Sequence, residues 1–271
     1  GLGDVYKRQE SQLRESLTSC FTYRELRKMA LTSVTMDSFQ LPLFILGPDS
    51  FPGIKGTLRV FEPRYKQMMD DCILDSKPFG YISIDPDLGK VDGWGQPAKY
   101  GTICDVVGYE ESGSNLIIQI SANSVFRVEN VIQPVLPGQA NLQNFPGVEE
   151  LMGLAGNPED GKLYLRADAS RLEEPAHDYD RSLFSEFVEN ATDVKDLLEM
   201  SSMYKGHALE IKSADRYETP ESEADLIWSL CLSLCYEVDL QQEIFSKDNY
   251  SDIMAICIDR INSIKARMEE E

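Results

Sequence analysis

The chain has 271 residues, 42% of them hydrophobic and 27% charged, which is the composition of a globular protein large enough to bury a core. Its 46 acidic and 26 basic residues give a formal net charge of −20, which argues against nucleic acids and anionic membranes as partners because lysine and arginine supply the affinity for both. The six cysteines are too scattered for the disulfide framework of a small secreted domain, so reduced, buried thiols are expected.

The N-terminal segment 1–38 is expected to be an extension that is disordered in part. Residues 10–35 are rich in Ser and Thr and carry several basic side chains, as transit segments do. Glu10, Glu15 and Glu25 favour an amphipathic helix instead. We therefore expect a cytoplasmic protein, with a plastid or another organelle as the alternative if 10–35 is a transit segment.

Residues 39–175 have the patterns of a β-rich region. Strands are predicted at 41–46, 57–60, 79–84, 100–109, 116–129 and 163–167. The run 116–129 alternates most clearly between apolar and polar side chains, as an antiparallel strand with one buried face does. Turn residues dominate 85–95, and the Pro- and Gly-rich segment 133–162 is predicted to be a long surface insertion.

A helix is predicted to begin at Glu62-Pro63, because the N–H that proline lacks has no helical partner at the first position. Apolar side chains then recur at helical spacing from Tyr65 to Ile73, which predicts one buried face. The period of 3.6 returns after Pro175, so 176–271 is predicted to be a helical region.

Within this helical region, helices are predicted over 183–198, from Thr219-Pro220 onward, and over 253–268. The middle helix has a single polar stripe of Ser229, Ser233 and Glu237, so it is expected to be largely buried. Strands followed by helices predict an α+β fold with a β-rich module and a helical module.

No catalytic, cofactor-binding or metal-binding residue is predicted. The segment 156–162 has the spacing of a phosphate-binding loop, but Leu163 stands where that loop requires Ser or Thr. Cys231 and Cys235 are one helical turn apart, yet no second pair of Cys or His matches them, so buried structural thiols are expected. The two histidines are His177 and His207, and no Gly-x-Ser-x-Gly elbow supplies a serine nucleophile.

One set of short motifs is specific in its order and spacing. Its residues are Pro42, Leu43, Phe44, Pro52, Gly53, Phe61, Glu62, Pro63, Arg64, Tyr65, Phe79, Gly80 and Gly101. In these residues the chain resembles the N-terminal substrate-binding domain of Lon proteases, most clearly over 39–132. The resemblance implies a PUA-like β pseudo-barrel followed by a C-terminal helical bundle. The insertion 133–162 is longer than the resemblance would suggest.

Most motif residues are interpreted as structural. Pro52-Gly53 suits a turn between strands, and Glu62 and Arg64 are expected to tie the start of the helix to the barrel by hydrogen bonds. Phe44 and Phe51 are candidates for contact with a bound polypeptide, with packing in the core as their other role.

The resemblance implies a non-catalytic module that binds unfolded or client polypeptides, as an adaptor in protein quality control or proteolysis. A protease or ligase complex is a further expected partner, and no cofactor is expected. Full Lon proteases add ATPase and Ser-Lys peptidase modules, for which this chain shows no motifs. Two alternatives stay open: a cryptic serine or cysteine peptidase, and an RNA-binding or small-ligand-binding PUA-like module.

Overall fold

The computed structural model describes residues 38–48, 50–136, 161–200, 222–235 and 237–270, with the side chains of 195–200 and 268–270 left aside. All of these residues except Ser38 belong to one compact unit, Phe39–Glu271. The extension predicted over 1–38 lies outside the described residues apart from Ser38, as do most of the insertion 133–162 and His207. No described helix is long and apolar enough to cross a membrane.

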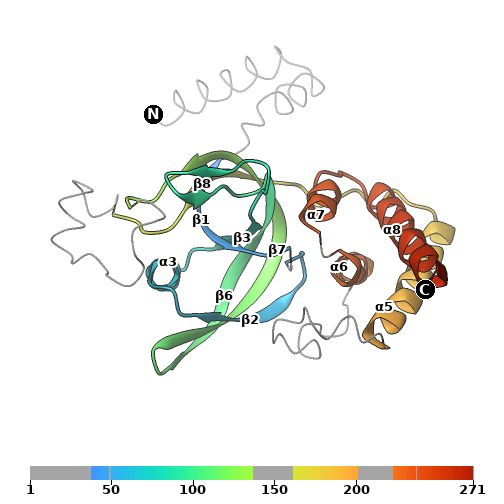
Figure 1. Cartoon of the computed structure of the whole chain (residues 1–271), viewed down its shortest axis with the longest axis horizontal. Coiled ribbons are helices and arrows are strands. Elements are labelled where there is room, and N and C mark those ends of the chain that lie inside the picture. Colours follow the sequence, from blue (N-terminus) through green and yellow to red (C-terminus); the bar gives the residue numbers. More distant parts are fainter. Residues whose placement is uncertain (1–37, 49, 137–160, 201–221, 236, 271) are drawn as a thin grey trace, which may run out of the picture. The chain divides into compact units, whose positions relative to one another are not determined.

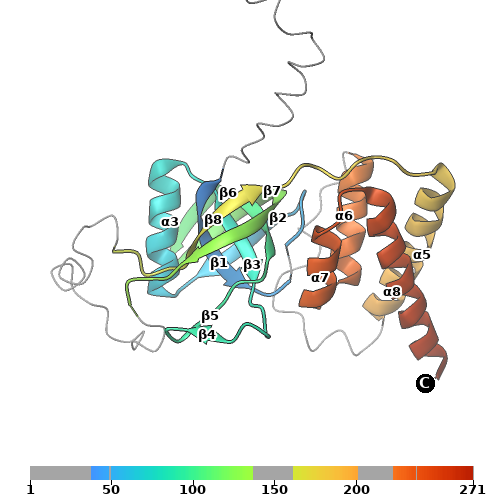
Figure 2. The same ribbon diagram turned by 90° about the horizontal axis from the view of Figure 1, so that it is seen from above.

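The larger sheet closes on itself to form a barrel (Figure 1). Its strands are β1 (Phe39–Leu46), β2 (Lys55–Val60), β3 (Phe79–Ser83), β6 (Tyr100–Ser112), β7 (Asn115–Ile132) and β8 (Arg166–Arg171). They lie in the order β2-β7-β6-β3-β1-β8, and β8 also pairs with β7, which closes the ring and leaves β2 as an addition to β7. The turn-rich segment contains a small hairpin of β4 (Lys90–Val91) and β5 (Trp94–Gly95), visible in Figure 2.

The strand β7 is shared between two neighbours on one edge. Its first part pairs with β2 through 116–121, and its second part pairs with β8 through 126–132. Backbone hydrogen bonds with Gly53, Ile54 and Leu172 extend these contacts to Ala122 and Val125. Neither β2 nor β8 reaches 123–124, so the edge of β7 has a short gap there.

The predicted strands are confirmed, with one correction at the last. β8 begins at Arg166, so Leu163 and Leu165 precede the strand although both are buried. The physical reason is the partner of Leu163, whose N–H donates to the side chain of Gln67 at 2.8 Å rather than to a neighbouring strand.

The helices are α3 (Pro63–Asp75), α5 (Arg181–Met200), α6 (Glu223–Leu234), α7 (Val238–Phe245) and α8 (Tyr250–Glu270). Pro63 occupies the first turn of α3 as predicted, and the helix buries Tyr65, Met68, Met69 and Cys72 against the barrel. The α+β class and the order of barrel and then helices are therefore confirmed.

Two helix boundaries differ from the prediction. α6 begins at Glu223, and the hydroxyl of Ser222 caps it by accepting the N–H of Asp225 at 3.1 Å; Thr219-Pro220 lies outside the described residues. The same helix ends at Leu234, because Cys235 is extended, so Glu237 precedes α7 instead of continuing the polar stripe. The predicted burial of α6 is confirmed, with Ser229 only 8% exposed.

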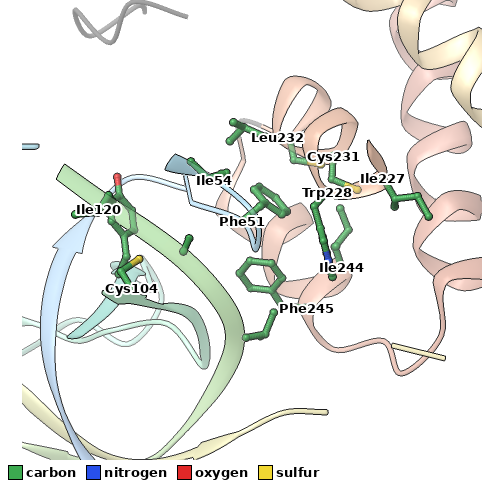
Figure 3. Close-up of a cluster of buried hydrophobic side chains, with 14 of the residues drawn as sticks. Phe51, Ile54, Cys104, Ile120, Ile227, Trp228, Cys231, Leu232, Ile244 and Phe245 are labelled. Atoms are coloured by element: carbon green, nitrogen blue, oxygen red, sulfur yellow. The ribbon is translucent and has the colours of Figure 1, made fainter. Parts of the chain in front are cut away.

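One hydrophobic core joins the barrel to the helices (Figure 3). Phe51, from the turn between β1 and β2, is fully buried with its ring centroid 5.1 Å from that of Phe245 and 6.1 Å from that of Trp228. Trp228 in turn lies 5.7 Å from the ring of Tyr250 at the start of α8. An aromatic side chain of the barrel region thus packs against α6 and α7, and Trp228 continues the cluster to α8.

Two glutamines of α7 satisfy backbone groups of the barrel. The side chain of Gln242 donates to the carbonyl of Tyr100 at 2.9 Å and accepts its N–H at 2.8 Å, as a neighbouring strand would. Gln241 donates to the carbonyls of Ser50 and Pro48 at 3.0 and 3.2 Å. Because unpaired buried backbone groups are costly, these bonds favour one position of α7 on the barrel.

Phe51→Ala is predicted to lower the free energy of unfolding by about 3–5 kcal/mol, because it empties a fully enclosed aromatic site. Phe61→Ala is the matched control, since Phe61 is 61% exposed and its truncation should change stability by no more than about 0.5 kcal/mol. Urea unfolding of the two variants measures the difference. Similar losses in both variants would show that Phe51 is not a core residue.

Candidate functional site

The two phenylalanines expected to contact a bound polypeptide are both buried. Phe44 is 3% exposed, with its ring centroid 4.2 Å from that of Tyr65, and Phe51 is fully buried among the helices. This burial agrees with the other role expected for them, packing in the core. β1 is covered on both faces, and the turn that follows it is covered by α6 and α7, which the local sequence did not indicate.

The start of α3 is held by a cluster of charged and aromatic side chains. Arg64 donates from Nε to Glu62 at 2.7 Å, and its guanidinium carbon lies 4.3 Å from the ring centroid of Tyr65 and 4.8 Å from that of Trp94. Hydrogen bonds from Glu62 and Arg64 to the barrel were expected, but these two side chains bond each other, and the contact with the barrel region is made differently. Arg64 stacks on the hairpin residue Trp94, and the Tyr65 hydroxyl donates to the carbonyl of Ile45 at 3.2 Å.

Two motif glycines make room for one aromatic ring inside the barrel. A Cβ added to Gly80 would lie 2.6 Å from Phe126, and one added to Gly101 would lie 2.7 Å from the same ring and 2.6 Å from the carbonyl oxygen of Tyr81. Separations below 3.0 Å are essentially never seen for real Cβ atoms. These glycines are therefore required by packing rather than by a ligand.

The other motif residues have structural positions as well. Pro42 and Leu43 lie in β1, where Leu43 is fully buried, and Phe79 is fully buried at the start of β3. Gly53 follows Pro52 in a turn with φ of 82°, which favours glycine. A Cβ at Gly53 would also meet the Asp225 carboxylate at 3.0 Å, so this turn lies against α6.

A cleft of about 920 Å³ opens where that turn meets α6; we call it the junction cleft. Its floor is 121–125 of β7, which includes the gap in the edge of that strand. The segment 52–55 and the segment 171–175 form its two sides, and the first turns of α6, with Trp228, form its wall. The cleft therefore exists only where barrel and helices meet.

The junction cleft offers hydrogen bonds, apolar surface and both signs of charge. Lys55 and Arg171 contribute positive charge to it, and Glu173 and Glu174 contribute negative charge. Val125, Leu172, Ala224 and Trp228 supply apolar atoms. Such a mixture suits a ligand that has polar backbone and apolar side chains, and it does not select strongly for one net charge.

Candidate nucleophiles in the described residues have surroundings that oppose catalysis. Burial raises the pKa of Cys72 and of Cys104 to about 12, and it also raises the pKa of Cys231, which is fully buried. Because the thiolate is the reactive form, these shifts disfavour a cysteine nucleophile at neutral pH. His177 bonds the carboxylate of Glu174 at 3.2 Å and lies on the surface.

The described residues contain no group of His, Cys, Asp and Glu arranged to hold a metal ion. Cys231 and Cys235 are buried as predicted, and the Sγ atom of Cys231 lies 3.5 Å from that of Cys257 on α8. Of the phosphate-loop-like segment, 156–160 lies outside the described residues, and Leu163 is buried.

A sequence model of the ATP-dependent protease La (LON) substrate-binding domain matches residues 40–263. Among solved structures, the Lon N-terminal domain protein from Xanthomonas campestris is similar, with 18% identity and a TM-score of 0.48 over 84% of this chain and 98% of that one. The N-terminal domain of Mycobacterium avium complex Lon protease has 10% identity and a TM-score of 0.51, over 83% and 98%. At 10% identity the latter structure supports the fold alone. A search of curated protein sequences found no significant match.

Arg64→Ala is predicted to lower the free energy of unfolding by about 1–3 kcal/mol, because it leaves Glu62 and Trp94 without their partner. Arg64→Lys should restore only part of the loss, since an ammonium group cannot stack as the planar guanidinium does. Arg59→Ala, at an exposed position of β2, is the control for removal of an arginine. Thermal unfolding compares the three, and equal melting temperatures for Arg64→Ala and the parent chain would refute this role.

Proposed function

Because the chain belongs to the Lon substrate-binding domain family, we propose that it is a module that binds unfolded or client polypeptides and performs no chemistry on them. The match over 40–263 is the observation that carries this proposal. It spans both the barrel and the helices, so the junction cleft between them lies within the matched region.

The geometry of the junction cleft supports an extended polypeptide as its ligand. The gap at 123–124 of β7 leaves a stretch of strand edge beside the cleft, and such edges bind backbone groups whatever the sequence. Apolar atoms in the lining, from half-buried Leu172 and from the buried side chains of Val125, Ala224 and Trp228, suit the apolar side chains that unfolded proteins display and folded proteins bury. The charges of opposite sign in the lining suit clients of varied composition.

An adaptor role follows as part of the same proposal. A module that holds clients without cleaving them requires a protease or ligase complex to act on what it holds, and such a complex is the expected partner. The raised pKa of Cys72 and Cys104 favours this reading over a cysteine peptidase, and the net charge of −20 favours it over RNA binding.

Asn123→Trp is predicted to weaken the binding of an unfolded, fluorescently labelled protein by about tenfold or more, because an indole would fill the junction cleft. Asn130→Trp is the matched control. Both asparagines are exposed on β7, and each donates to an aspartate of a neighbouring strand, at 2.6 Å to Asp105 and 3.2 Å to Asp168. Fluorescence anisotropy measures both affinities, and equal weakening by the two variants would place the binding site elsewhere.

The salt dependence of the same binding gives a second check. Apolar burial persists when salt rises from about 0.05 M to about 1 M, whereas charge attraction is screened. We expect equal or tighter binding of the unfolded protein at high salt, no binding of its folded form, and an intact client at the end of the assay. Failure to bind the unfolded form at either salt concentration would contradict the proposed function.

A further inference from the structure

The strand β6 continues beyond its neighbour β3. The two strands pair through 102–104, where Cys104 lies opposite Phe79, the first residue of β3. β6 then runs on to Ser112, paired on one edge with β7. Along 105–112 no described strand covers its other edge. Since alternate residues of an antiparallel strand direct their N–H and C=O groups away from a given neighbour, this edge presents unpaired backbone groups.

A groove of about 460 Å³ follows this free edge. It is lined by 105–109 of β6 and by residues at the end of α3, including Cys72, Ile73 and Lys77. Val107 and Tyr109 are each 60% exposed along the groove, and Leu74 on α3 is 82% exposed. The unpaired backbone therefore lies beside apolar side chains that a bound chain could cover.

The surroundings of the groove are strongly acidic. Asp105 lines the groove, Glu110 and Glu111 follow on the same strand, and α3 carries Asp70, Asp71 and Asp75. The nearby lysines are already engaged: Lys77 bonds Asp75 and Lys162 bonds Asp71, both at 2.7 Å, and Lys66 bonds the carbonyl of Ser114.

The pKa of Asp70 agrees with this excess of negative charge. It is raised above its ordinary value, first by desolvation and then by the charges of Asp71 and Glu111. A carboxylate whose proton is held more tightly by neighbouring carboxylates lies in a negative potential. Basic side chains placed here would relieve that repulsion.

The same charges decide which strand can add to the edge. A second copy of this chain would bring its own carboxylates to the edge, and like charges opposed across strands are destabilising. The bulge between Val106 and Gly108 further disfavours a long, flat pairing between copies. An extended segment that alternates basic and apolar residues avoids the like-charge repulsion, and a short one can pair to one side of the bulge.

We propose that the free edge of β6 binds such a basic, extended segment of another polypeptide as an added strand. Its backbone pairs with 105–112, its lysine or arginine side chains lie on the face of the strand that carries Glu111, near Asp70, and its apolar side chains lie on the opposite face. This surface shares no lining residue with the junction cleft and goes beyond the function proposed there.

The test uses short labelled peptides and the full chain. A peptide that alternates lysine with valine should bind, and its glutamate–valine counterpart should not. Glu110→Lys combined with Glu111→Lys should weaken the basic peptide by about tenfold or more. Glu186→Lys combined with Glu189→Lys, at exposed positions of α5, makes the same change in net charge away from the groove and should weaken it far less.

Strand addition is tested separately from charge. A lysine–valine peptide with alternate backbone amides methylated keeps its side chains but cannot pair along both of its edges, so it should lose most of its affinity if the methylated edge faces β6. Two peptides are measured, one methylated at the odd-numbered amides and one at the even-numbered amides. One of the two should lose most of its affinity. Hydrogen exchange should slow at the outward amides of 105–112 when the unmodified peptide binds.

Three results would overturn the inference: equal binding of the basic and acidic peptides, equal binding in both methylation registers, or equal weakening by the two charge-reversal pairs. If the parent chain binds the unfolded client but not the basic peptide, this inference alone is rejected. If it binds the basic peptide but not the unfolded client, only the proposed function is rejected.

Discussion

The packing of Phe51 against Trp228 and Phe245 is the contact on which the rest of the structure depends. Phe51 belongs to the turn between β1 and β2, yet its partners lie in α6 and α7. The bonds of Gln241 and Gln242 to barrel carbonyls fix the direction from which α7 approaches. Because apolar burial and satisfied backbone groups both require this one arrangement, one hydrophobic core is shared by barrel and helices, beside a second cluster that includes Leu43, Ile103 and Phe126.

This arrangement also creates the junction cleft, whose floor belongs to the barrel and whose wall belongs to α6. Motif residues of the turn contribute to it, since Pro52-Gly53 forms one side and Gly53 lies against Asp225. The groove at the edge of β6 has a different origin. It depends only on the barrel and α3, so the two surfaces respond to different substitutions.

Local patterns in the sequence predicted the elements well, and they failed where distant residues decide the structure. The alternation of β7 and the proline at the start of α3 have local causes, and both were predicted. The bonds of Gln242 to Tyr100 join residues 142 positions apart, and no periodicity marks them. Phe51 was considered for ligand contact because nothing in its own turn shows that α6 covers it. The junction cleft was missed for the same reason, because its sides and wall come from segments far apart in the chain.

Native-state hydrogen exchange tests the single shared core most directly. Amides in the middle of β7 and in the middle of α8 are compared over a series of denaturant concentrations. If barrel and helices form one cooperative unit, their most protected amides exchange with the same free energy and the same dependence on denaturant. If amides of α8 exchange with a lower free energy than those of β7, the helices unfold from an intact barrel. That result would contradict the account.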